Sequence, residues 1–470
     1  MSKYITQRCV DRDQQIGEVE KRLNAIRLGQ TVFDSILEWY GIPGIGKTTL
    51  AQGAIAGLCE KKKIPFACLD FDPKKNDKAS KIPGEPILLL EDILEGIGTG
   101  APIDFEQAVK KYRQAPDEDL RAEREKKVLQ EFLHHVYRLL ENDPVVLIFD
   151  TTDKVEPDVA AWVEENVISP LCLKGKCLVI WTGRFPQRWR RFEVRRRVVS
   201  SRLDPLPREA TVEQVGPIEV DVYRFTFGHP MGNERLSEAI SRFEKEKQTF
   251  GERDLINVVN RVIDEYVMQG ILPELNAACR ALAVVRQFDV IILRRILSEF
   301  VSHFKDIDAY LKVIGQLTET SLVEWDAVRK GYALDETLRH ILALHLRLNQ
   351  PERYSAINEV ASKIYDEWIE RVRENRSVYV LERLYHQASI AGSRGETQSY
   401  IADKLHGELQ GYLGKYYRDG DREFAISSAT QLYQEMRRDN ELREIVGEQG
   451  FSRLEETVNS HRLTLAQGKS

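Results

Sequence analysis

The chain has 470 residues, with 74 acidic side chains against 68 lysines and arginines and a formal net charge of −6 at pH 7. At ~150 residues per domain this length favours about three domains. The mildly acidic balance argues against a molecule devoted to binding nucleic acid. There is no run of about 18 apolar residues, so we expect no transmembrane helix. The start lacks the apolar core of a signal peptide and the six cysteines are scattered, which favours reduced thiols in a cytoplasmic protein.

The first patterned segment, residues 8–26, is amphipathic. Ile16, Val19 and Leu23 recur at helical spacing, and we expect Asp11 or Asp13 to cap the helix. By itself this segment predicts only a helix with one face packed on a core.

A phosphate-binding loop follows. Residues 41–48 read Gly-Ile-Pro-Gly-Ile-Gly-Lys-Thr and fit the pattern G-x-x-x-x-G-K-[ST] at every fixed position. A buried strand over residues 33–40 precedes the loop, and a helix over 49–59 follows with its positive end towards the anion. Lys47 would supply charge to the β and γ phosphates, and the Thr48 hydroxyl suits Mg²⁺. The other candidate nucleotide-binding residues here are Gly41, Gly44, Gly46 and Thr49, at positions where backbone N–H groups approach phosphate oxygens.

The next strong signal is an apolar strand that ends in an acid. After a strand over 65–72 and helices over 87–97 and 128–141, residues 145–149 are all apolar and Asp150 follows. In open parallel sheets, ligands lie at the carboxyl ends of such strands. Asp150 is therefore our candidate for organising Mg²⁺. Asp153 is a candidate either to polarise the attacking water or to cap the next helix, over 158–168.

Another buried strand, over residues 176–184, ends in polar side chains. Arg184 at its end could read a γ-phosphate through charge-assisted hydrogen bonds. The run 188–199 is strongly basic and contains aromatic residues. It fits a nucleic-acid patch, or the exposed side of an edge strand whose charges block edge pairing; we favour the edge strand. Residues 201–210 are predicted to be the last strand turning into a helix.

Three segments resemble motifs of the STAND NTPases, the signalling class that contains NB-ARC and NACHT proteins. Residues 9–13 (Cys-Val-Asp-Arg-Asp) resemble the box that lines the adenine pocket. Val10 and Arg12 match it, and Asp11 stands where the family usually has glycine. Thr182 and Arg184 resemble the family's sensor. Residues 228–230 (Gly-His-Pro) resemble the Gly-x-Pro segment of the helical lid, which implies that His229 and Pro230 approach the nucleotide.

The sequence pattern of the second half of the chain predicts helices and one small β-hairpin. Residues 271–346 have the pattern of a winged helix, with a wing hairpin turning around residues 329–331 and a helix over 335–346. Where the family has a Met-His-Asp triplet that touches ADP, residues 334–336 read Leu-Asp-Glu, without the histidine. Residues 352–460 are helical throughout and suggest a short TPR-like array.

Together these features predict an α/β fold, in which a P-loop NTPase core with a parallel sheet is followed by helical domains. The expected domains are a nucleotide-binding domain (1–205), a helical lid (206–270), a winged helix (271–346) and a TPR-like domain (347–470).

The resemblance implies an ATP-binding molecular switch. ADP would hold lid and winged helix against the core, exchange for ATP would permit homo-oligomerisation, and slow ATP hydrolysis would reset the switch. The catalytic candidates are Lys47, Asp150, Asp153 and Arg184, the metal candidates are Thr48 and Asp150, and the cofactors are ATP or ADP with Mg²⁺. The adenine-box segment begins at about residue 8, so we expect a separate effector protein as partner, in defence or stress signalling, and no membrane.

Two other functions fit parts of the sequence. An AAA+ ATPase similar to origin-recognition proteins would bind duplex DNA through its winged helix, although residues 308–320 carry little positive charge. A pseudo-NTPase scaffold would bind nucleotide without hydrolysing it.

Overall fold

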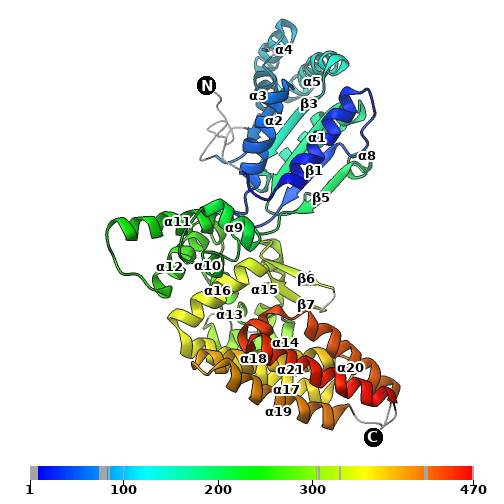
Figure 1. The fold of residues 1–470 in the computed structure, drawn as a ribbon. Coiled ribbons are helices and arrows are strands. Elements are labelled where there is room, and N and C mark those ends of the chain that lie inside the picture. Colours follow the sequence, from blue (N-terminus) through cyan, green and yellow to red (C-terminus); the bar gives the residue numbers. More distant parts are fainter. Residues whose placement is uncertain are drawn as a thin grey trace. The chain divides into compact units, whose positions relative to one another are not determined.

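The chain forms two compact units in this computed structural model, Met1–Glu238 and Ala239–Ser470. The structure describes residues 9–73, 82, 85–98, 100–302, 304, 307–327, 330–417 and 422–467, and each unit is described by itself (Figure 1). Within these residues, no helix is both long and apolar enough to cross a bilayer. The division into four domains stays a prediction.

The first unit is built on a five-stranded parallel sheet. Its strands are β1 (Ile36–Tyr40), β2 (Phe66–Asp70), β3 (Val145–Asp150), β4 (Cys177–Gly183) and β5 (Val198–Arg202), in the order β2-β3-β4-β1-β5. All pairings are parallel. The carboxyl ends of the strands therefore meet at one edge, where the residues that follow β1, β3 and β4 come together.

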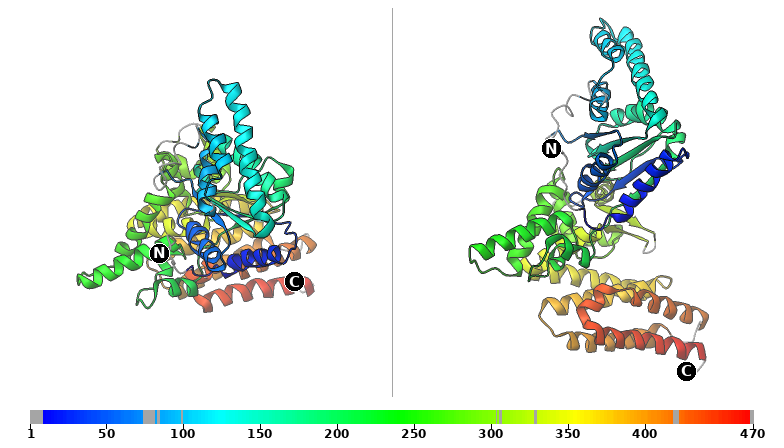
Figure 2. Two further views of the ribbon diagram at one scale, coloured as in Figure 1. Left: turned by 90° about the horizontal axis from the view of Figure 1, so that it is seen from above. Right: turned by 45° about the horizontal axis from the view of Figure 1, so that its top comes forward.

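Helices precede, connect and follow these strands, and the last of them runs on into the second unit. In chain order they are α1 (Asp13–Arg27), η1 (Thr49–Ile55), α2 (Ala56–Lys62), α3 (Leu88–Ile97), α4 (Ile103–Arg113), α5 (Glu118–Asn142), η2 (Thr152–Lys154), α6 (Pro157–Val163), η3 (Glu164–Ile168), α7 (Ser169–Leu173), α8 (Phe192–Arg195), α9 (Arg208–Val215), α10 (Tyr223–Thr226) and α11 (Pro230–Lys245). Helices α4 and α5 pack side by side and extend away from the sheet (Figure 2).

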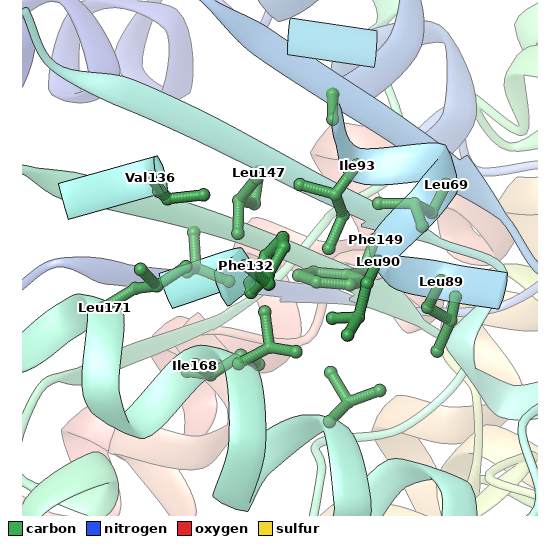
Figure 3. Packing of buried hydrophobic residues seen from close by; sticks show 14 of the residues in the cluster. Leu69, Leu89, Leu90, Ile93, Phe132, Val136, Leu147, Phe149, Ile168 and Leu171 are labelled. Carbon is green, nitrogen blue, oxygen red and sulfur yellow. The ribbon is translucent and has the colours of Figure 1, made fainter. Parts of the chain in front are cut away.

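The core of the first unit lies between β3 and the helices beside it. Phe132 and Val136 of α5 lie beside Leu147 and Phe149 of β3 (Figure 3). All four side chains are fully buried. At about 1.5–3 kcal/mol for each large apolar side chain that leaves water, this packing fixes the strand that ends in Asp150. The α/β core expected from the sequence is confirmed.

Three local predictions for the first unit were wrong. Helix α1 begins at Asp13 with Arg12 as its N-cap, and no side chain caps it. The helix predicted over 128–141 begins already at Glu118, as α5, and the charged residues 118–127 are mostly exposed. The edge strand β5 begins only at Val198, so most of the basic run 188–199 forms a loop and the short helix α8.

In the second unit, α12 (Glu252–Val262) and η4 (Ile263–Val267) fall in the segment predicted as the helical lid. The elements that follow have the order predicted for residues 271–346. They are α13 (Pro273–Leu282), α14 (Val290–Phe300), α15 (Ile307–Glu319), the antiparallel pair β6 (Val323–Asp326) and β7 (Gly331–Leu334), and α16 (Glu336–Asn349). Asp335 accepts the N–H of Leu338 and so caps α16. Part of the predicted wing turn, at Arg329, lies outside the described residues.

The rest of the second unit is helical, as expected. Its helices are α17 (Pro351–Arg371), α18 (Arg376–Ser393), α19 (Gln398–Tyr416), α20 (Arg422–Arg437) and α21 (Asn440–Gln467), which bends at Gly447. They share one apolar core, in which Leu405, Leu409 and Phe451 are buried.

Candidate nucleotide-binding site

The phosphate loop joins β1 to η1, as predicted. The Lys47 ammonium donates to two carbonyl groups of its own loop, those of Gly41 (2.7 Å) and Ile42 (3.0 Å). Burial lowers the pKa of Lys47 to about 8, while Asp153 and Asp150 act in the opposite direction. Lys47 is thus a half-buried cation whose ammonium is held by two carbonyl groups of its own loop, with Asp153 and Asp150 acting from further away. Thr49 is the first residue of η1.

Asp150 lies at the carboxyl end of β3 and is only 1% exposed. Its carboxylate accepts hydrogen bonds from the hydroxyls of Thr182 and Thr48 and, at 2.9 Å, from the Gln52 amide. Burial nevertheless raises its pKa. The site therefore brings together Thr48 and Asp150, the two predicted metal ligands.

This pair fits Mg²⁺. A hard cation prefers oxygen ligands, and a hydroxyl beside a buried carboxylate provides them. A cation would also offset the burial cost that raises the Asp150 pKa. When bound, Mg²⁺ would supply charge stabilisation to phosphate oxygens, and Thr48 and Asp150 would hold it.

Asp153 and Arg184 lie together beyond the ends of β3 and β4. The guanidinium Nε lies 3.1 Å from Oδ2 of Asp153, and the side chain of Asp153 is only 9% exposed. Asp153 does not cap the following helix, because the N-cap of α6 is Glu156. The capping alternative was therefore wrong, and the predicted base and the predicted sensor form an ion pair.

The segment predicted to line the adenine pocket braces the phosphate loop. The Arg12 guanidinium is 5% exposed and donates to the carbonyls of Ile45 (3.3 Å) and Asp204 (2.8 Å). Asp11 has φ +53°, the left-handed conformation that a glycine would adopt, so the turn tolerates this change. Val10 packs with Leu206 and Ala210 in a small apolar cluster.

The Gly-His-Pro segment contacts the phosphate loop directly. His229 is fully buried; its Nδ1 accepts the N–H of Gly232 (3.1 Å), so Nε2 donates to the carbonyl of Pro43 (2.9 Å). A Cβ on Gly44 would lie 2.6 Å from the His229 ring, and one on Gly228 would lie 1.9 Å from the Leu206 carbonyl oxygen. Both glycines are therefore required by close approach. Pro230 begins α11, one residue past this contact.

Three polar residues of the site escaped the sequence prediction: Gln52, Asp70 and Thr151. Asp70 ends β2 in register with Asp150, and Gln52 and Thr151 donate to it. The signal was present, because residues 66–70 also form a strand that ends in an acid, but strand order is needed to see that β2 and β3 are neighbours.

The sequence matches no family model and no curated protein. Among solved structures, the chain is similar to a Walker-type ATPase of Pyrococcus abyssi, with 14% identity, coverage of 73% of this chain and 99% of that one, and a TM-score of 0.46. It is also similar to Cdc6p from Pyrobaculum aerophilum, with 13% identity, 75% and 97% coverage and a TM-score of 0.38. A third similar structure is the Aeropyrum pernix Orc1 protein in complex with DNA. It has 12% identity, coverage of 71% of this chain and 92% of that one, and a TM-score of 0.36.

These likenesses are distant, and the P-loop NTPase core is assigned from the chain itself. Its phosphate loop, parallel sheet and acid-tipped strand β3 meet at one edge. Such an edge can hold a triphosphate between backbone N–H groups, Lys47 and a metal-binding acid.

Proposed function

We propose that this chain is a STAND-type switch that binds ATP or ADP with Mg²⁺ and hydrolyses ATP slowly. The observation that carries the proposal is the contact between the Gly-His-Pro segment and the phosphate loop. His229 holds the Pro43 carbonyl and leaves no room for a side chain at Gly44. A segment outside the sheet is thereby attached to the loop that would enclose phosphates.

In this proposal each site residue has one role. Lys47 leaves the carbonyls of Gly41 and Ile42 to bind the phosphates, and Thr48 and Asp150 hold Mg²⁺. Arg184 reads the γ-phosphate. While Arg184 pairs with Asp153, that carboxylate is engaged by the guanidinium and is not available to a water molecule. When Arg184 turns to the γ-phosphate, Asp153 is released to polarise water.

The switch follows from coupling through the loop. A phosphate that moves Lys47 away from the loop carbonyls changes the backbone that His229 also contacts. ADP and ATP differ in what they offer Lys47 and Arg184, so each favours a different position of the lid. In the ATP state the chain would form a homo-oligomer and recruit a separate effector, in defence or stress signalling.

Sedimentation of the full chain tests this function. With Mg²⁺ and ADP we expect monomers, and with Mg²⁺ and a slowly hydrolysed ATP analogue we expect a larger species. Lys47→Ala should stay monomeric in both, and Asp150→Ala should bind nucleotide without this response. Identical sedimentation of the wild type in both nucleotides would contradict the switch. Single-turnover hydrolysis in the same samples separates a working ATPase from a scaffold, and Asp153→Ala tests the role of Asp153.

The second candidate is DNA binding through the winged helix, which the order α14, α15, β6, β7 favours. Two observations oppose it. Ile291 and Leu311, on α14 and α15, are 48% and 57% exposed, which places apolar groups where phosphate contacts would be needed. In the basic run, Arg191 is paired with Glu193 (2.6 Å) and Glu165 (3.0 Å). A titration with duplex DNA at several salt concentrations decides, since tight, salt-sensitive binding would favour this candidate.

A further inference from the structure

We propose that Asp70 is a positioning residue of the nucleotide site, which fixes Asp150 through Gln52 and fixes the turn after Asp150 through Thr151. This inference rests on the proposed nucleotide-binding function and adds to it a residue that no motif marks. Asp70 would act through other side chains and would not itself touch phosphate.

The first link runs through Gln52 on η1. Its amide nitrogen Nε2 donates to Oδ2 of Asp70 at 3.1 Å and to Oδ2 of Asp150 at 2.9 Å. A carboxamide has two N–H groups, so one Gln52 amide can serve both carboxylates at once. Asp70 and Asp150 end neighbouring strands in register, and two carboxylates so placed would otherwise repel each other. The amide therefore fixes the spacing of two like charges.

The second link runs through Thr151, directly after Asp150. Its hydroxyl donates to Oδ1 of Asp70 at 2.9 Å. Thr151 has φ +60°, a left-handed conformation that β-branched residues rarely adopt. Such strain persists where surrounding contacts enforce it, and it occurs often at functional sites. The bond to Asp70 is a contact that can enforce it here.

This turn sets the direction of the residues that follow. The Thr152 hydroxyl donates to the Thr182 carbonyl of β4 at 3.0 Å, and Asp153 pairs with Arg184. A turn that relaxes at Thr151 would move Asp153 away from β4. Asp70 is thus linked to the metal-binding acid on one side and to the predicted base on the other.

The chemistry requires a carboxylate at this position. Asp70 accepts from Gln52 and Thr151, and also from the N–H of Asp72 at 2.9 Å. An asparagine has the same shape, but its NH₂ group would face one of these donors and lose that bond. Asp70→Asn is therefore a close steric match that removes the proposed role.

The test uses the full chain with Asp70→Asn, Thr151→Gly and the double variant. Asp72→Asn is the matched control, because it removes a neighbouring carboxylate, paired with Lys154 at 2.7 Å, and keeps the N–H to Asp70. Three quantities are measured: the affinity for a fluorescent ADP analogue with Mg²⁺ and with EDTA, the single-turnover ATP hydrolysis rate, and the denaturation midpoint.

For Asp70→Asn we expect the Mg²⁺-dependent gain in ADP affinity and the hydrolysis rate each to fall by about tenfold, a usual size for residues that support metal ligands. Affinity in EDTA should stay at the wild-type value, and Asp72→Asn should match the wild type throughout. Glycine adopts φ > 0 without strain. Thr151→Gly should therefore make the turn less dependent on Asp70, and the double variant should recover part of the hydrolysis rate lost in Asp70→Asn.

Wild-type values of Mg²⁺-dependent affinity and hydrolysis in Asp70→Asn would overturn the proposal. So would an equal loss of affinity in Mg²⁺ and in EDTA with a lowered midpoint, because that pattern describes a purely structural residue. Failure of the proposed function has a different signature. If the wild type binds nucleotide without hydrolysing it, the Mg²⁺-dependent gain in affinity still tests the role of Asp70. If the wild type binds no nucleotide, both the proposed function and the role of Asp70 are contradicted.

Discussion

The two compact units treat buried charge in opposite ways. In the first unit, burial lowers the pKa of Lys47 to about 8 and raises the pKa of Asp150, so both groups shift towards their neutral forms. In the second unit, burial alone would lower the pKa of Arg286, but Asp439 and Glu382 outweigh it and the pKa is raised. In the proposed site a ligand would complete the charges of Lys47 and Asp150, whereas Arg286 is already paired within the protein.

The paired charges of the second unit join elements that lie far apart in its sequence. Arg286, between α13 and α14, lies 2.6 Å from Asp439 and 3.0 Å from Glu382 of α18. Its guanidinium stands 4.2 Å from the ring centre of Tyr385. Arg339 of α16 pairs in the same way with Glu441 of α21. The comparison teaches that burial of charge alone does not mark a ligand site, because a buried charge can be fully paired within the protein.

The largest expected effect comes from breaking a completed pair. Arg286→Ala would leave Glu382 and Asp439 buried without their cation, and we expect it to destabilise the second unit by about 3–5 kcal/mol. Chemical denaturation followed by circular dichroism measures this. Arg295→Ala, which breaks an exposed pair with Glu367, is the control and should leave the midpoint nearly unchanged. Equal denaturation midpoints for Arg286→Ala and Arg295→Ala would contradict the claim that the buried pairs of Arg286 stabilise the second unit.

Removing the cation of the first unit should act on binding instead. Lys47→Ala deletes a charge-assisted contact to phosphate. Such a contact contributes about 1.5–3 kcal/mol, so we expect ADP affinity to fall by about 10–100-fold. Titration with a fluorescent ADP analogue measures it. The control is Lys61→Ala, on the exposed end of α2. A Lys47→Ala chain with wild-type affinity and normal stability would show that the loop does not bind phosphate.

Neutralising the buried acid should stabilise the chain without ligand. The folded-state pKa of Asp150 is raised, so its ionisation costs stability as pH rises above the ordinary value of about 3.9. Asp150→Asn removes that cost. We expect a higher midpoint than the wild type at pH 7, with a difference that shrinks towards about pH 4. Asp104→Asn on the surface of α4 is the control, and a lower Asp150→Asn midpoint would contradict this account.

The pH dependence of binding gives a smaller, graded effect. Lys47 loses its proton above about pH 8 in the free chain, and the phosphates bind the protonated form. ADP affinity should therefore be level below that pH and fall above it, approaching tenfold per pH unit. Titrations between about pH 6.5 and 9.5 measure this. A flat profile would show that Lys47 keeps an ordinary pKa.

The sequence predicted the elements of this fold better than their contacts. The phosphate loop, the strand ending in Asp150 and the winged-helix order follow from local patterns and were found where expected. Strand order was not predictable, because it depends on which helices pack on which face. The neighbourhood of Asp70 and Asp150 was therefore missed. The pairing of Asp153 with Arg184 joins two separate loops, and no local pattern encodes it.

The most direct test of the central claim is the rate of ADP release from His229→Ala. If His229 couples the lid to the phosphate loop, losing its buried hydrogen bond to Pro43 should speed ADP release. A hydrogen bond that contributes about 1 kcal/mol corresponds to about a fivefold faster release. Stopped-flow displacement of a fluorescent ADP analogue measures the rate, with the exposed His134→Ala on α5 as control. Release at the wild-type rate from a folded His229→Ala chain would contradict the proposed switch.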